Sequence, residues 1–181
     1  MRFRETPLPG AFVIEPEPSY DSRGWLARIF CNAEFAQHGL SFDLVQGYQS
    51  KSLQKGTIRG LHYQVPPMVE SKLVRCVAGA IYDLILDLRP DSPTYLLSFG
   101  LELTADNGLA LYVPGMLAHG TQALTDGAQV LSLSNRAYAR AYERGVRYDD
   151  LNLAGRWPLP VTNVSAKDLT WPTIRLIEMQ P

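Results

Sequence analysis

The chain has 181 residues and a formal net charge of −1, with 46% hydrophobic and 19% charged residues. These are the values of an ordinary globular protein long enough to bury a substantial core, so we expect one domain over residues 1–181. Its basic residues are scattered, its first residues lack the apolar region of a secretory signal, and no apolar run reaches the roughly 18 to 20 residues of a membrane span. We therefore expect a cytoplasmic protein that binds neither nucleic acid nor membrane.

Thirteen prolines and fourteen glycines divide the chain into short segments. The first predicted element is a short helix over residues 31–39, CNAEFAQHG, with Asn32 as its cap and Gly39 at its end. Segments rich in Val, Ile, Leu, Tyr and Thr then predict strands, which cover residues 57–64, 72–79, 80–89, 95–104, 109–113, 119–125 and 129–134. From about Trp157 onward the chain is proline-rich and irregular, and we expect it to lie over the strands. Many short strands with one minor helix indicate a mainly β fold: a sandwich, a jelly roll or a small barrel.

The two cysteines are Cys31 and Cys76, and they do not form a CxxC pair. Two isolated thiols predict neither a disulfide framework nor a zinc site. We interpret them as reduced thiols.

His62 lies inside the strand predicted over residues 57–64, in the stretch RGLHYQVPP. A lone histidine in an apolar strand is more often an ordinary core residue than a catalyst. However, the two-residue period of a strand places His62 and Gln64 on the same face, so polar groups would point into the barrel. Burying polar groups costs free energy unless they are paired. Several of them on one interior face therefore favour a ligand site.

A bound metal is the first interpretation of such a site. Metal sites in β barrels of the cupin type need an HxH pair on one strand, a nearby carboxylate and a third histidine. Here Gln64 stands where the second histidine would be, and amide oxygen is a poor ligand for a transition metal. The other candidates are His119 and Glu70, while His38 belongs to the predicted helix. This ligand set makes a metal site improbable.

Acid–base catalysis is the second interpretation, because histidine is suited to proton transfer near neutral pH. A carboxylate would orient the base, and both Asp83 and Asp168 are candidates. Arg59 and Lys72 would suit a substrate that carries phosphates or develops an oxyanion, and His119 could add a hydrogen bond. A base in a basic, polar barrel mouth indicates proton abstraction beside a carbonyl group.

Six motifs together resemble the dTDP-4-dehydrorhamnose 3,5-epimerase family, in the same order and at matching spacing from about residue 4 to residue 172. They are DSRGW (21–25), KGTIRGLHYQVPP (55–67), KLVRCVAGAIYDLILDLRPDSPTY (72–95), YVPGMLAHG (112–120), ERGVRYDD (143–150) and VSAKD (164–168). The resemblance implies a double-stranded β-helix or jelly roll of the cupin type, without metal or other cofactor and usually a homodimer. It also implies a carbohydrate epimerase that acts on a nucleotide diphosphate-sugar, a 4-keto-6-deoxy hexose, in deoxysugar biosynthesis.

The resemblance also implies roles for individual residues. His62 would remove the proton beside the ketone, Asp168 would hold and polarise that histidine, and Lys72 would stabilise the enolate oxygen. Contacts to the nucleotide diphosphate-sugar would come from Arg23, Arg59 and His119, with Glu143 and Lys167 on the rim and Tyr138 stacked on the nucleotide base.

The chain departs from the family pattern where the opposite-face proton donor is expected. The family carries a tyrosine there, and this chain has Ser132, whose alkyl hydroxyl is a far weaker acid than a phenol with its unperturbed pKa of about 10. Arg28 replaces a frequent glutamate, and Tyr48 replaces the asparagine of a QxN motif that begins at Gln46. These positions tend to contact nucleotide or sugar. The phenol of Tyr48 could replace the missing donor or could serve only in packing.

Three hypotheses follow. The first is an active epimerase of altered scope, which inverts C3, C5 or both. The second is a related enzyme or binding protein for nucleotide-sugars that does not epimerise the dTDP substrate. The third is a metal-dependent cupin of another class, such as an isomerase or a dioxygenase.

Overall fold

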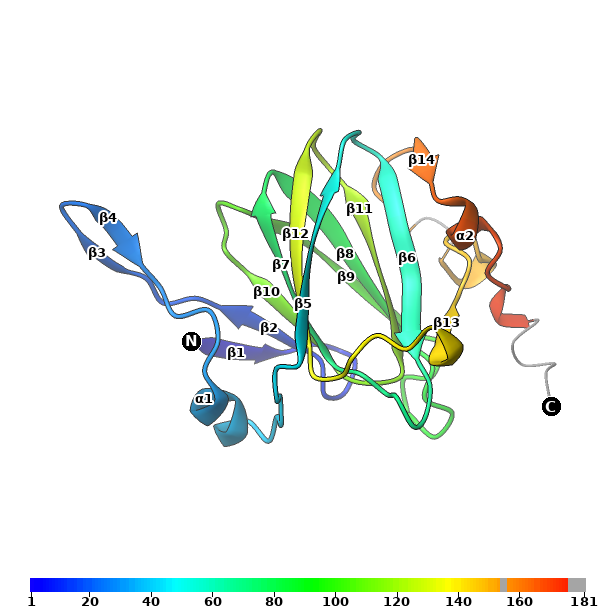
Figure 1. The fold of residues 1–181 in the computed structure, drawn as a ribbon, viewed down its shortest axis with the longest axis horizontal. Helices are drawn as coiled ribbons and strands as arrows, with labels where there is room; N and C mark the ends of the chain where they lie inside the picture. Colours follow the sequence, from blue (N-terminus) through cyan, green and yellow to red (C-terminus); the bar gives the residue numbers. More distant parts are fainter. Residues whose placement is uncertain (154–155, 176–181) are drawn as a thin grey trace.

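The computed structural model describes residues 1–153 and 156–175, and these form two packed sheets with a hairpin projecting from them (Figure 1). The first sheet contains, in spatial order, β1 (Arg2–Glu5), β2 (Phe12–Glu15), β10 (Ala110–Val113), β7 (Lys72–Ala78), β12 (Ala128–Ser134) and β5 (Gln46–Ser52). The second contains β13 (Glu143–Gly145), β6 (Thr57–Gln64), β11 (Leu117–Ala123), β8 (Ala80–Asp87) and β9 (Ser98–Thr104). Within each of these orders neighbouring strands are antiparallel, while β14 (Asn163–Val164) pairs with β6 in parallel. The projecting hairpin is β3 (Ser19–Asp21) with β4 (Gly24–Leu26).

The helical elements that begin and end within residues 1–153 and 156–175 are few and short. They are α1 (Asn32–Gln37), α2 (Ala166–Leu169) and the 3-10 turns η1 (Arg140–Tyr142) and η2 (Leu151–Leu153). A mainly β jelly roll with minor helices was predicted, and this prediction is confirmed.

All seven predicted strands are present, as β6 to β12. The strand predicted over 95–104 begins later, at Ser98, because the preceding residues form turns. The amide of Leu97 donates there to the carbonyl of Thr94. The sequence pattern missed the strands before residue 53 for a physical reason. β3 and β4 are three residues long and exposed, and β5, with the sequence QGYQSKS, offers no apolar alternation.

The predicted helix is present, but its cap differs from the prediction. Asn32 is the first helical residue, and Cys31 takes the capping position without a side-chain hydrogen bond. Asn32 as the cap was therefore wrong. Gly39 follows the helix with a φ of +72°, a left-handed conformation that glycine adopts readily, so the predicted end is confirmed.

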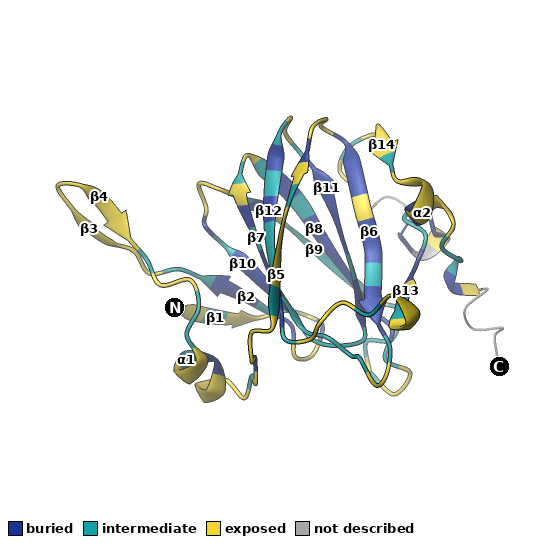
Figure 2. Cartoon of the chain, in the orientation of Figure 1, coloured by how far each residue is buried: buried dark blue, intermediate teal, exposed yellow. Residues whose placement is uncertain are grey.

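The two sheets enclose a core between them and are covered on parts of their outer faces (Figure 2). The outer face of the second sheet packs against Val146, Leu153 and Ile174, which come from the chain after β13. Strand β8 is consequently buried on both faces, and this explains why its sequence AIYDLILD alternates only in part. The segment 156–175 lies against this sheet, through β14 and α2 beside β6.

Cys31 and Cys76 are both free thiols, as predicted. Within residues 1–153 and 156–175, no helix combines the length and the apolarity needed to cross a membrane.

Candidate active site

A cavity of about 210 Å³ opens between the two sheets and collects polar side chains from both. The second sheet contributes Arg59, His62 and Gln64 from β6 and His119 and Thr121 from β11. The first sheet contributes side chains from three strands and from the approach to β7, namely Gln46, Tyr48, Ser50, Glu70, Lys72, Ser132 and Ser134. His62 and Gln64 line the same cavity, as the two-residue period predicted.

His62 is paired with Asp168. The Nε2 atom of His62 lies 2.6 Å from Oδ1 of Asp168, whose side chain is only 5% exposed. The other carboxylate oxygen of Asp168 accepts a hydrogen bond of 3.3 Å from the amide of Gly60. At the start of α2, the hydroxyl of Ser165 accepts from the amide of Asp168 and fixes the turn. Among residues 1–153 and 156–175, no hydrogen bond engages Nδ1 of His62, so this nitrogen can face a substrate.

The electrostatics of the pair favour an ionised carboxylate. Burial by itself would raise the pKa of Asp168, but the hydrogen bond and charge interaction with His62 outweigh it, aided by the Gly60 amide and the Ser165 hydroxyl. The pKa of Asp168 therefore lies below its ordinary value. An ionised carboxylate at this distance holds the imidazole in one orientation.

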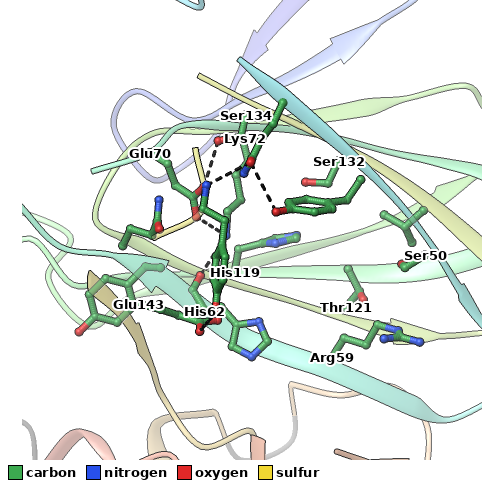
Figure 3. A pocket seen from close by; sticks show the side chains of 16 residues that line it. Ser50, Arg59, His62, Glu70, Lys72, His119, Thr121, Ser132, Ser134 and Glu143 are labelled. Carbon is green, nitrogen blue, oxygen red and sulfur yellow. Dashed lines mark hydrogen bonds and ion pairs between the residues drawn. The ribbon is translucent and has the colours of Figure 1, made fainter. Parts of the chain in front are cut away.

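Lys72 lies on the opposite side of the cavity and is held by Glu70 (Figure 3). Its Nζ atom is 3.1 Å from Oε1 of Glu70 and donates a hydrogen bond of 3.4 Å to the carbonyl of His62. The hydroxyl of Ser134 donates to the other oxygen of Glu70 at 2.9 Å. Glu70, considered as a metal ligand from the sequence, is thus the counter-ion of Lys72. A lysine ammonium held in this way can stabilise negative charge that develops on a substrate oxygen.

His119 forms a second buried pair, with Asp83. Its Nε2 atom lies 2.8 Å from Oδ1 of Asp83, but without the alignment of a regular hydrogen bond. Because His119 is the β-ladder partner of His62, both imidazoles belong to the same wall of the cavity. The structure thus resolves the choice between the two candidate carboxylates, since Asp168 orients His62 and Asp83 faces His119.

Gln64 uses its amide to support a loop. Its Nε2 donates to the carbonyls of Met68 and Ala137, and its Oε1 accepts from the amide of Ala139. Across the described ranges 1–153 and 156–175, no three side chains of His, Cys, Asp or Glu gather in a way that could hold a metal ion. The residues at the HxH position and around it therefore do not fit a cupin metal site.

A polar cluster forms the rim of the cavity. Glu143 accepts from the phenol of Tyr138 at 2.7 Å and from Nζ of Lys167 at 2.6 Å. Burial would raise the pKa of Glu143, but Lys167 and Tyr138 lower it below its ordinary value. Through its hydrogen bond to Glu143, the pKa of Tyr138 is raised. Lys167 itself lines the neighbouring pocket behind β6, beside Arg59 and Asp168.

Arg23 and Arg28, both predicted to contact the substrate, do not line the cavity. The hairpin of β3 and β4 projects from the sheets (Figure 1). Arg23 lies between these two strands and pairs with Asp21, and Arg28 follows the hairpin and pairs with Glu34. A role for Arg23 and Arg28 in substrate binding stays a prediction.

Ser132 and Tyr48 are direct partners across the β12–β5 ladder. Both line the cavity on the wall opposite His62 (Figure 3 shows Ser132 there). The hydroxyl of Tyr48 lies 3.4 Å from Oε1 of Gln46, which also accepts from the amide of Tyr138 at 3.1 Å. The two positions on this wall where the chain departs from the family pattern, Ser132 and Tyr48, are thus adjacent.

Sequence reasoning missed Ser50, Thr121 and Ser134 as lining residues. The strand period could have found them, because each lies two residues from a lining residue that was identified: Tyr48, His119 and Ser132. It also missed Trp171, whose ring centroid lies 6.0 Å from that of His62. No local signal marks Trp171, because the fold brings it there.

Comparisons with known proteins agree with this geometry. The family model described as dTDP-4-dehydrorhamnose 3,5-epimerase matches residues 5–175. The chain belongs to the dTDP-4-dehydrorhamnose 3,5-epimerase family. The predictions of this family and of a carbohydrate epimerase are confirmed.

Individual relatives cover nearly the whole chain. The dTDP-4-dehydrorhamnose 3,5-epimerase of Shigella flexneri is 36% identical over 170 residues, which are 93% of this chain and 93% of the relative. The dTDP-4-dehydrorhamnose 3-epimerase of Streptomyces niveus is 35% identical over 169 residues, covering 93% and 81%. Among solved structures, the 3,5-epimerase of Bacillus anthracis with TDP and PPi bound superposes with a TM-score of 0.92 at 36% identity, covering 96% of this chain and 99% of that one.

Proposed function

We propose that this epimerase inverts a carbon beside the ketone of a dTDP-linked 4-keto-6-deoxy hexose, through an enolate. The observation that carries the proposal is the His62–Asp168 pair on one wall of the cavity with the Lys72 ammonium on the other. Inversion beside a ketone requires a base, a stabiliser for the oxyanion and a proton donor on the opposite face. His62 and Lys72, side chains suited to the first two roles, line one cavity between the sheets.

The chemistry follows from this geometry. Nδ1 of His62 takes the proton from the carbon beside the ketone, and the electrons of that C–H bond move into the enolate. Lys72 stabilises the negative oxygen, while Asp168 stabilises the imidazolium. A proton then returns to the same carbon from the opposite face, which restores the ketone with inverted configuration. Nothing is oxidised or reduced in this sequence.

The nucleotide portion would be held by the basic and aromatic groups around the cavity. Arg59 and His119 line it, and Tyr138 on the rim offers an exposed ring for the nucleotide base. Lys167 and Glu143 support Tyr138 from below, with Nζ of Lys167 5.9 Å from the centroid of its ring. The TDP bound in the Bacillus anthracis relative supports thymine as the base.

The reaction is tested with dTDP-4-keto-6-deoxyglucose in D₂O, followed by NMR at C3 and C5. We expect deuterium at one or both carbons together with the epimeric product. Deuterium at C3 alone would indicate a 3-epimerase, the activity named for the Streptomyces niveus relative. Tight binding of the nucleotide-sugar by calorimetric titration, without label at either carbon, would refute the reaction and favour a protein that binds without epimerising.

We also propose that the enzyme is cytoplasmic and that its active form is a homodimer. The hairpin β3–β4 extends away from its own sheets and exposes Tyr20, Trp25 and Leu26 at 74%, 61% and 80% (Figure 2). A second copy of the chain would cover these side chains. Arg23 does not line the cavity of its own chain, and in a dimer it would contact the cavity of the second copy. Sedimentation equilibrium should give twice the 20.2 kDa of one chain, and Trp25→Glu should shift the mass toward the monomer. A monomer at micromolar concentration would contradict the proposal.

A further inference from the structure

The proposed reaction requires a proton donor on the face of the substrate opposite His62. The identity of this donor is inferred on the basis of the proposed function, in which His62 removes the proton from its own side. Since His62 belongs to the second sheet, the donor must approach from the wall formed by the first sheet. That wall carries side chains from β5, β7 and β12.

Most groups on that wall are unsuited to donating the proton. The hydroxyls of Ser50, Ser132 and Ser134 are alkyl hydroxyls, which are very weak acids. Lys72 faces the oxyanion in the proposed reaction and is paired with Glu70. The carboxylate of Glu70 is occupied as the acceptor for both Lys72 and Ser134.

Three phenols line the cavity, and only one lies on the required wall. Tyr63 is on β6 beside His62, with its ring buried in the outer core of the second sheet. Tyr138 lies on the rim, outside the strands of the first sheet, and its hydroxyl donates a hydrogen bond of 2.7 Å to Glu143. Tyr48, on β5 of the first sheet, is the third.

We propose that Tyr48 is the general acid that returns the proton to the substrate carbon on the face opposite His62. Its ladder partner is Ser132, and directly opposed residues on one face of an antiparallel pair have Cβ atoms about 5 Å apart. The small side chain of Ser132 leaves space beside the ring of Tyr48. Gln46, 3.4 Å from the phenol oxygen, is fixed by the amide of Tyr138 and limits the positions the hydroxyl can take.

Tyr48 and His62 return to their starting protonation states by exchanging protons with water. Tyr48 gives its O–H proton to the enolate carbon, where a C–H bond forms and the ketone is restored. The phenolate then takes a proton from water, to which the 54% exposed Tyr48 has access. His62 releases the proton it took, and its side chain is 28% exposed. Each turnover therefore leaves both residues in their starting states.

The diagnostic variant is Tyr48→Phe, which keeps the ring and removes only the hydroxyl. His62 can still form the enolate and return a solvent-derived deuteron to the same face. We expect deuterium to enter the substrate with retained configuration, while formation of the epimer falls by about 10²-fold or more. Inversion by Tyr48→Phe at the wild-type rate would overturn the inference, as would a parallel loss of exchange and inversion.

A side-chain exchange between the two strands supplies a matched control. The double variant Tyr48→Ser with Ser132→Tyr keeps the composition and moves the phenol to the facing strand. It should recover inversion that the single variant Tyr48→Ser has lost. No recovery, with both variants folded by circular dichroism, would count against a role for a phenol on this wall. Failure of the proposed function appears differently, as wild-type protein that gives neither exchange nor epimer.

Discussion

Replacing Asp168 by Asn tests how the carboxylate supports His62. The asparagine has nearly the same shape but is neutral, and its amide N–H would face Nε2 of His62 where the carboxylate now accepts. The imidazole would then carry its proton on Nδ1, the nitrogen that has to receive the proton from the substrate. We therefore expect the Asp168→Asn variant to fold and to lose most of its activity.

The magnitude follows from the pair itself. His62 and Asp168 are 2.6 Å apart at their nearest atoms, and the carboxylate side chain is 5% exposed. Opposite charges centred about 4 Å apart interact by about 4 kcal/mol at an effective dielectric constant of about 20. If that interaction is lost in the transition state, the rate falls by about 10³-fold.

The assay is deuterium uptake at the carbon beside the ketone, measured with saturating nucleotide-sugar. Asp149→Asn is the matched control, because the same chemical change occurs at a surface residue paired with Arg147. The control should keep wild-type activity. A folded Asp168→Asn variant within threefold of the wild type would refute the role assigned to the pair.

Further predictions concern the oxyanion, the core and pH. Lys72→Met keeps the apolar stem and removes the charge, so kcat should fall by about 10²-fold or more while the Kd for dTDP from calorimetry changes little. Asp87→Asn should lower the free energy of unfolding by about 3 kcal/mol in urea titrations, because the fully buried carboxylate pairs with Arg89 and accepts from Ser92 and Thr94. The pKa values of Asp87, Asp168 and Glu143 are lowered in the folded protein, so the unfolded chain binds more protons once the pH falls toward about 4. Their stabilisation is thus complete near neutral pH and is lost as pH falls below about 4, and equal urea midpoints at about pH 6 and about pH 3.5 would contradict this.

The strands of the two sheets were predictable where apolar residues dominate, as in β6 to β12. Strand β5 was not, because it is polar and lies at the edge of its sheet, yet it carries Gln46, Tyr48 and Ser50 into the cavity. Propensity gives no signal for such a strand, which is held by its ladder to β12.

The centre of the site was predictable in part. The strand period placed His62 and Gln64 on one face, and the family resemblance supplied the roles of Asp168 and Lys72. From the residues alone, Asp83 and Asp168 were equal candidates for orienting His62. The fold decides between the two carboxylates. The parallel pairing of β14 with β6 brings α2, which carries Asp168, beside His62, although these two residues are 106 positions apart in the chain. The single-domain organisation and the cytoplasmic location stay predictions.

The central claim is that His62 removes a proton from the carbon beside the ketone. The direct measurement is the initial rate of deuterium entry at C3 and C5 of dTDP-4-keto-6-deoxyglucose in D₂O, for the wild type and for His62→Asn at equal concentration. The mechanism predicts uptake by the wild type and a loss of about 10³-fold or more in the variant, with nucleotide binding retained. Uptake by His62→Asn at the wild-type rate would contradict it.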